Sequence, residues 1–207
     1  MTRIHTVNPL YYIAPAVLLA LLVFLLRTGH SNEMTDNLAV RVASLELGID
    51  GYTIGNKLTS MQKEIASDKI SKDSYEGTYK FKDNDLFIIV AKNDDIILAI
   101  YQRNDKADME QAKSMISGLM SQYGEPTTMA HDNLIYWAYN SAGKISEETY
   151  NKLRGDKKTI EILATVKFNS SFEITGENPA EEEEATNYFI ISSDLLTQEF
   201  ISSNRKE

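Results

Sequence analysis

Few residues in this chain have the types and spacings that chemistry requires. The 207 residues include no cysteine, which excludes a disulfide scaffold, a thiolate metal site, a cysteine nucleophile and an acylated lipoprotein terminus. The three histidines, His5, His30 and His131, leave little for histidine-based metal chemistry, and we expect His131 in a solvated turn. No serine stands in a G-x-S-x-G nucleophile elbow, and no H-E-x-x-H occurs. The sequence therefore predicts no catalytic residue, no metal, no cofactor and no enzyme.

An acidic turn is the nearest approach to a metal motif. Asp83-Asn84-Asp85 begins like a calcium loop, but Ile88 and Asp94 stand where that loop needs glycine and glutamate. Two neighbouring turns could still hold an adventitious calcium, although acidic turns usually serve solubility and turn formation. The carboxylates of this minority reading are Asp83, Asp85, Asp94 and Asp95.

A glycine-rich stretch and a run of glutamates are two further patterns, and we interpret both as loops. The glycines of residues 47–55 do not form a phosphate loop, because the spacing before Lys57 is one residue short and Leu58 replaces the Ser or Thr that binds magnesium. We interpret this stretch as a turn-rich loop. Glu181-Glu182-Glu183-Glu184 predicts a solvated loop, with docking on a basic partner as the alternative.

Three aromatic residues on one expected strand are the candidate interface. Alternation along a strand places Tyr136 on one face and Trp137 with Tyr139 on the other. One of these faces must be core, so the other exposes one or two aromatic side chains, which commonly anchor interfaces. The alternative is that helices cover both faces.

The charge of the chain excludes one class of partner. The formal net charge is −9, and residues 1–27 contain Arg3 and Arg27 but no acid, so the remainder holds 19 basic and 30 acidic residues, a net of −11. Such an acidic domain repels phosphate backbones and anionic lipid headgroups. We therefore expect no nucleic-acid binding.

An apolar segment near the N-terminus predicts a membrane anchor. Residues 9–26 are 18 residues without a charge, and at about 1.5 Å per residue they reach about 27 Å, close to the thickness of a hydrocarbon core. Pro15 could kink such a helix. A cleaved signal peptide and a buried core helix are the alternatives. The anchor residues are Pro9, Tyr11, Tyr12, Leu18, Leu22, Phe24 and Leu26.

This segment divides the chain into an anchor, residues 1–30, and a soluble domain, residues 31–207. Lys and Arg counts on the two sides are nearly equal, so the charge rule barely decides the orientation. The short N-terminal tail favours an N-inside signal-anchor. We therefore expect a single-pass protein of a bacterial inner membrane with its domain in the periplasm.

The rest of the chain predicts an α+β fold with about six antiparallel strands packed by helices. The order of these elements admits an α-β-β-β pseudo-repeat. Continuous apolar runs in two of the strands indicate that both sheet faces are partly covered. Helices are expected at residues 31–47, with Gly48 as the stop of this first helix, and at 58–65, 107–123 and 146–154. Residues 194–201 are expected to form a short helix or a trailing strand. Strands are expected at residues 78–81, 85–92, 95–103, 133–140, 158–169 and 187–192.

One junction resembles a known type of module. Leu119-Met120-Ser121-Gln122-Tyr123-Gly124-Glu125-Pro126-Thr127, followed by Leu134-Ile135-Tyr136-Trp137-Ala138-Tyr139, is similar to the helix–GxP–strand–WxY junction of small periplasmic modules. These include the small lipoprotein of the outer-membrane protein assembly machine and the domains of β-lactamase-inhibitor protein. Ile54-Gly55 resembles the glycine that enters the helix in the same modules. The chain departs from the lipoprotein in lacking an acylated cysteine.

That resemblance implies a non-enzymatic scaffold or binding domain, and it carries over no binding residue. With the anchor, it predicts an accessory subunit of a cell-envelope complex, which acts by contacting other envelope or membrane proteins through β-edge addition or an apolar groove. The second hypothesis is a sensor or carrier for a lipid or another apolar small molecule. An enzyme is the third.

Overall fold

The computed structural model describes the domain that follows the apolar segment. The anchor residues Pro9, Tyr11, Tyr12, Leu18, Leu22, Phe24 and Leu26 lie outside the described residues, as do His131 and Glu181–Glu184. Within the described part of the chain, no helix is both long enough and apolar enough to cross a membrane. The structure describes residues 37–71, 75–130, 133–156, 159–171 and 185–204.

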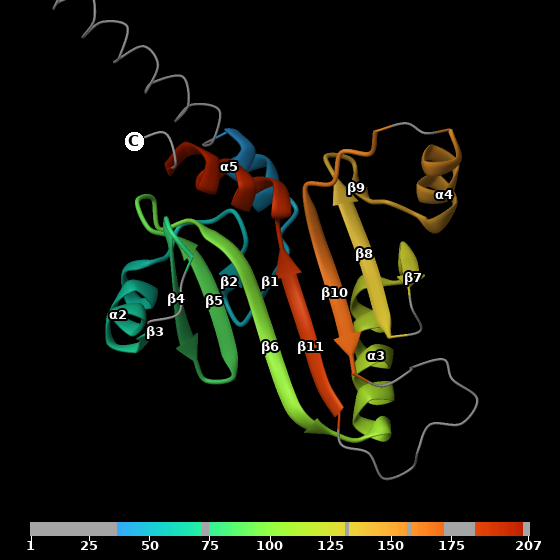
Figure 1. Cartoon of the computed structure of the whole chain (residues 1–207), viewed down its shortest axis with the longest axis horizontal. Helices are drawn as coiled ribbons and strands as arrows, with labels where there is room; N and C mark the ends of the chain where they lie inside the picture. The colour runs from blue at the N-terminus through green and yellow to red at the C-terminus, as the bar shows by residue number, and fades with distance from the viewer. Residues whose placement is uncertain (1–36, 72–74, 131–132, 157–158, 172–184, 205–207) are drawn as a thin grey trace, which may run out of the picture. The chain divides into compact units, whose positions relative to one another are not determined.

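The fold is α+β and is built on one large antiparallel sheet of nine strands (Figure 1). Its strand order is β3-β4-β5-β6-β11-β10-β8-β7, and β9 pairs with β8. A separate two-stranded sheet is formed by β1 (Gly48–Ile49) and β2 (Tyr52–Thr53). The nine strands are β3 (Ile70–Ser71), β4 (Thr78–Asp83), β5 (Leu86–Ala91), β6 (Ile97–Ala107), β7 (Thr128–Ala130), β8 (Leu134–Asn140), β9 (Gly143–Lys144), β10 (Ala164–Ser170) and β11 (Ala185–Ser192).

Local sequence explains where the helices begin. Thr59 and Asp108 each close a capping box with the glutamine three residues later, and Ser146 accepts a hydrogen bond from the backbone N–H of Thr149. The longest helix ends where Gly124, at φ 72°, adopts a backbone that glycine tolerates best. The helices are α2 (Ser60–Lys69), α3 (Met109–Tyr123), α4 (Glu147–Gly155) and α5 (Asp194–Asn204), and residues 37–43 are also helical.

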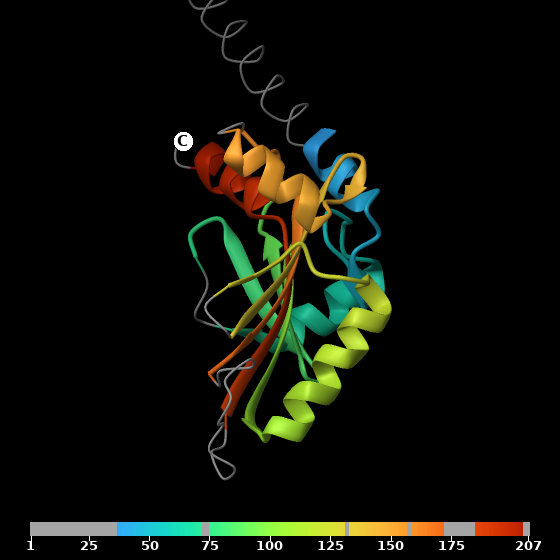
Figure 2. The same ribbon diagram turned by 90° about the vertical axis from the view of Figure 1, so that its right-hand side faces the viewer.

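The two faces of the sheet have different environments. Figure 2 shows α2 and α3 on one side of the sheet, while α4 and α5 lie at one end of it. Over the middle of the opposite side, the described part of the chain places no helix (Figures 1 and 2). The side chains that point toward α3 therefore form the core, and those that point away remain partly accessible.

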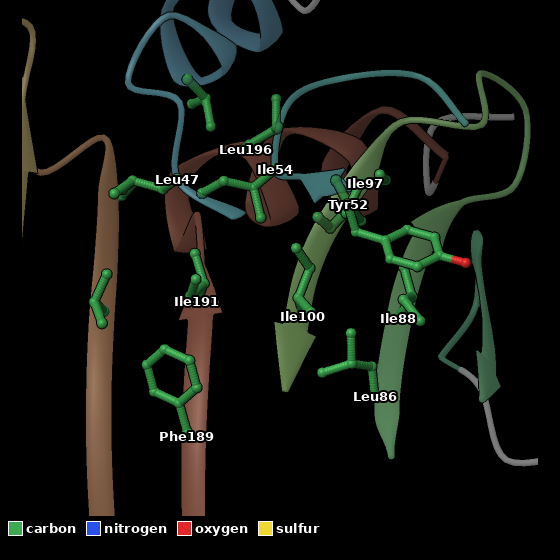
Figure 3. Packing of buried hydrophobic residues seen from close by; sticks show 14 of the residues in the cluster. Leu47, Tyr52, Ile54, Leu86, Ile88, Ile97, Ile100, Phe189, Ile191 and Leu196 are labelled. Atoms are coloured by element: carbon green, nitrogen blue, oxygen red, sulfur yellow. The ribbon is translucent and has the colours of Figure 1, made fainter. Parts of the chain in front are cut away.

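One row of paired residues shows how completely the core face is filled. Six neighbours on β4, β5, β6, β11, β10 and β8 each have an exposed fraction of 0%. Tyr52, Ile54 and Leu47, from the segment around β1 and β2, belong to the same cluster (Figure 3). The row consists of Phe81, Ile88, Ile100, Ile191, Val166 and Trp137.

Most predicted elements are confirmed, and the differences have simple causes. The six predicted strands are the six longest strands of the sheet, but the count of about six misses the short β3, β7 and β9. The strand predicted from residue 158 begins only at Ala164, where pairing with Tyr139 near the end of β8 starts. In the described residues the first helix ends at residue 43, and Gly48 opens β1, so Gly48 is not the helix stop.

Both sheet faces are at least partly covered, as predicted, but over the middle of one face no helix of the described residues provides the cover. In β5 fully buried and partly exposed residues alternate from Leu86 to Val90, although all five are apolar. Phe87 and Ile89 point away from the core, where long neighbouring side chains shelter them instead of helices.

Candidate functional site

The side of the sheet that points away from α3 is the candidate site, and we call it the open face. Its central row of paired residues crosses six strands: Lys82, Phe87, Tyr101, Ile190, Lys167 and Tyr136. Lys80, Ile89, Arg103 and Tyr188 lie two residues along the same strands, so they share this face. A one-residue step along each strand thus separates a fully buried row from a mixed aromatic and basic row.

Aromatic rings and cations pair repeatedly on the open face. The rings of Phe87 and Tyr101 are stacked, with centroids 4.8 Å apart and planes inclined by 9°. The ammonium groups of Lys80 and Lys82 lie 6.0 and 5.3 Å from the centroid of the Phe87 ring. Every one of these four side chains comes from β4, β5 or β6, so this cluster occupies one half of the face.

Two further cation–aromatic pairs occupy the other half. Arg103 lies 5.7 Å from the ring of Tyr188, and the Nζ of Lys167 lies 5.6 Å from the ring of Tyr136. Both cations also have acidic neighbours, because Arg103 pairs with Asp105 and Lys167 pairs with Asp194 at 3.4 Å. These two cations are therefore partly neutralised by the chain itself.

Two tyrosines of this face, Tyr101 and Tyr136, have a pKa that is raised above its ordinary value, so both are uncharged at neutral pH. Burial raises the pKa of Tyr136 to about 12, with the Asp194 carboxylate as a smaller cause. Burial also raises the pKa of Tyr101. The face therefore offers phenol hydroxyl groups, apolar ring edges and positive charge, which suits binding better than proton transfer.

Only one of the three aromatic residues singled out from the sequence lies on the open face. Tyr136 does, whereas Trp137 has an exposed fraction of 0% and donates its Nε1–H to the carbonyl of Gly124 at 2.8 Å. Tyr139 packs against the core cluster. Trp137 is therefore not available as an interface anchor, whereas Tyr139 lies on the same side of the sheet as Trp137 and is half-buried.

The edge of the sheet at β8 offers little room for strand addition. The first part of β8 pairs with β7 and its end pairs with β9. Between these two strands, the hydroxyl of Thr127 accepts from the N–H of Ala138, and the carbonyl of Ala138 accepts from Ile145. Because these groups of β8 are already paired, a partner strand on this side of the sheet would have to add to the short β7 or β9.

The acidic turns do not come together as a calcium site. Asp83 and Asp85 flank the β4–β5 turn, whereas Asp94 and Asp95 lie in the β5–β6 turn, and the six residues of β5 separate the two turns by about 20 Å. Among the described residues, no three His, Cys, Asp or Glu side chains gather as metal ligands.

Each of these turns instead has one aspartate bonded to a tyrosine. Tyr52 donates its hydroxyl to Asp83 at 2.8 Å, and Tyr79 donates to Asp95 at 2.9 Å. Lys63 of α2 pairs with Asp95 at 2.6 Å. Burial, followed by these carboxylates, raises the pKa of both tyrosines. The clusters fasten α2 and the β1–β2 segment to the sheet.

Asp95→Asn should weaken the fold at neutral pH. The hydrogen bond from Lys63 lowers the pKa of Asp95, with the Tyr79 hydroxyl as a smaller cause. The carboxylate therefore contributes stability above its unfolded pKa of about 3.9, and this contribution is lost as the pH falls through the lower pKa of the folded protein. We expect the free energy of unfolding of the variant to be lower than that of the wild type by at most about 1 kcal/mol at pH 7, and this difference to shrink toward pH 3.

Urea unfolding at both pH values measures this difference. Asp94→Asn, an exposed position in the same turn, is the matched control and should change little at either pH. Equal losses in the two variants, or a loss that does not depend on pH, would contradict the role of the Asp95 carboxylate.

A hollow between α2 and β4 is the nearest feature to a ligand pocket. It measures about 520 Å³. A smaller hollow of about 400 Å³ lies between Met115 of α3 and the strand residues Gln102, Asn104 and Asn187. The rest of the interface between α3 and the sheet is filled by Ala112, Ile116 and Leu119. The lining residues are Lys63, Ala66, Ser67, Ile70, Thr78, Tyr79, Lys92 and Asp95.

Comparison with known proteins adds no further guide. The chain matches no protein-family model, no curated protein and no solved structure. The resemblance of the Gly124–Pro126 junction to small periplasmic modules therefore stays a prediction.

Most residues of the open face were missed at the level of sequence. Lys80, Lys82 and Phe87 lie in strands that were predicted, but nothing in their pattern shows which face a helix covers. The available signal was alternation of basic or aromatic residues with apolar ones, as in Tyr79-Lys80-Phe81-Lys82.

Proposed function

We propose that this chain is a membrane-anchored, non-enzymatic accessory subunit of a cell-envelope complex, and that its domain binds another protein through the open face. The observation that carries the proposal is a broad sheet face with partly accessible aromatic and aliphatic side chains and no helix of the described chain over its middle. Accessible aromatic side chains are enriched in protein–protein interfaces.

Three other features support the proposal. The apolar run at residues 9–26 has the length of a membrane span, and the chain lacks cysteine, as exported proteins without disulfides can. In the sheet, α2 precedes β4–β6 and α3 precedes β8, β10 and β11, with β6 beside β11. We interpret this arrangement as an α-β-β-β pseudo-repeat, in keeping with the module type that the sequence resembles.

Site-specific photo-crosslinking of the full chain in native membranes tests this function. A photoreactive phenylalanine analogue replaces Tyr101 or Ile190 on the open face, or Lys113 on the exposed side of α3 as control. We expect one protein, identified by mass spectrometry, to crosslink at Tyr101 and Ile190 but not at Lys113. The chain should also stay in the membrane fraction after alkaline washing.

Two outcomes would contradict the proposal. Equal crosslinking at Lys113 would show that the open face is not the binding surface. A chain that lacks its first residues and leaves the membrane fraction would favour the cleaved signal peptide and remove the anchored role.

A carrier of an apolar small molecule is the second candidate. The hollow beside Ile70 and Tyr79 is the observation that favours it. Native mass spectrometry of the detergent-extracted chain separates the two candidates, since a carrier keeps a bound lipid in defined stoichiometry, and Ala66→Trp should displace that lipid from the hollow.

A further inference from the structure

The open face carries positive charge although the chain as a whole is acidic. Its cations are Lys80, Lys82, Arg103 and Lys167, whereas the net charge of the chain is −9. Arg103 and Lys167 already have Asp105 and Asp194 as partners. Among the described residues, no carboxylate forms an ion pair with Lys80 or Lys82. The surplus positive charge of the face is therefore concentrated on β4.

The two lysines are held close to each other by one ring. Both ammonium groups lie within 6.0 Å of the centroid of Phe87, so two like charges share one small area. A carboxylate placed between them would replace this repulsion by attraction, and cation–aromatic contact would persist. The β4 end of the face is thus complementary to an acidic group.

The remainder of the central row is apolar and has a defined length. Tyr101 and Ile190 continue it on the next strands, and Lys167 follows on β10, one strand before the row ends at Tyr136. From β4 to β10 there are four interstrand steps, which amount to about 19 Å at about 4.8 Å each. A helix of about 13 residues or an extended segment of about six residues spans that distance.

The geometry of the rings disfavours stacking of nucleic-acid bases. One face of the Phe87 ring is stacked on Tyr101. Its other face is turned toward β4, where Lys80 and Lys82 lie over it. Proteins that bind single strands leave ring faces free for bases, and here those of Phe87 are occupied. The acidic remainder of the chain also repels a long polyanion or an anionic membrane.

We propose, on the basis of the docking function above, that the open face binds an acidic, amphipathic segment of a partner protein. The carboxylates of that segment lie at Lys80 and Lys82, and its apolar side chains lie along Tyr101 and Ile190. A second acidic group at the far end of the segment competes with Asp194 for Lys167, a pair whose present separation of 3.4 Å is long.

Binding of a synthetic probe to the full chain in phosphatidylcholine nanodiscs tests this inference. The probe is an amphipathic peptide of about 13 residues with glutamates at both ends, and its matched control has lysines in their place. We expect the acidic peptide alone to bind, with NMR shift changes at Phe87 and Tyr101. Lys80→Glu with Lys82→Glu should weaken binding by about tenfold, and the double glutamine variant by less.

The control variant combines Lys113→Glu with Lys152→Glu, two exposed lysines on α3 and α4, and should bind like the wild type. Failure of the acidic peptide to bind, equal binding of the lysine peptide, or unchanged affinity of the Lys80 and Lys82 variants would overturn the inference. Perturbation of Phe87 and Tyr101 by a single-stranded oligonucleotide or by phosphatidylglycerol vesicles instead would reassign the face to nucleic acid or lipid.

The same variants separate this inference from the proposed function. The photoreactive residue at position 101 can also be tested in the variant with Lys80→Glu and Lys82→Glu. If it still crosslinks the partner in membranes, the open face is the docking surface but its ligand is not acidic. If crosslinking at Tyr101 is absent in the wild type, the docking function itself fails.

Discussion

Gly55→Ala should destabilise the domain by about 3 kcal/mol, one of the two largest effects we expect from a single methyl-sized change. Gly55 has φ 84°, a left-handed conformation that costs an L-residue about 1 kcal/mol or more. A Cβ at this position would lie 2.6 Å from the carbonyl oxygen of Ala39 and 2.6 Å from the backbone nitrogen of Ala43. Because both are backbone atoms, the helical residues 37–43 would have to move away.

Gly51→Ala isolates the conformational part of this effect. Gly51 has nearly the same φ, 83°, but an added Cβ would meet nothing within 4 Å. We expect Gly51→Ala to lower the free energy of unfolding, measured with urea or heat, by only about 1 kcal/mol. Equal losses at Gly51 and Gly55 would show that the contact with residues 39–43 contributes nothing.

This contact also bears on how the domain would be joined to its anchor. Ala39 and Val42 are buried in the core, and Gly55 allows their helix to approach the β2 segment closely. Arg41 adds an exposed ion pair with Glu161 at 2.8 Å. If the segment at residues 9–26 spans a membrane, ten residues, 27–36, connect it to a helix that is integrated in the core. The connecting residues would then lead directly into a helix that is packed in the core.

The regular elements of the fold could be predicted because their signals are local. The strand β5 carries a run of β-forming residues between two turns, and α3 combines apolar periodicity with an aspartate cap and a terminal glycine. The short strands β7 and β9 have no comparable signal. They exist because the edge of β8 requires backbone partners, which is a tertiary effect.

The candidate site was predictable only in part, for a related reason. Alternation correctly separated Tyr136 from Trp137, since neighbouring strand residues point to opposite faces. Which face becomes core depends on where α3 packs, and that is not encoded in residues 134–140 alone. The pairing of Phe87 with Tyr101 across β5 and β6 requires the register of the hairpin, which a one-residue shift would destroy.

The edge of β8 leads to the second large effect. Thr127 has an exposed fraction of 0%, and its hydroxyl donates to the carbonyl of Ile145 at 2.6 Å while it accepts from the N–H of Ala138 at 2.9 Å. One side chain thus replaces strand pairing in the gap between β7 and β9. Since Ala138 and Ile145 are themselves buried, neither backbone group has ready access to water.

Thr127→Val should therefore destabilise the domain by about 3 kcal/mol, although valine has nearly the same shape. It removes one hydroxyl and leaves two buried backbone groups without a partner, each at a cost of about 1–3 kcal/mol. Thr127→Ser, which keeps the hydroxyl and loses the methyl group, should cost only about 1 kcal/mol. Urea unfolding of the two variants decides the point, because a serine variant less stable than the valine variant would mean that packing, and not hydrogen bonding, holds this edge.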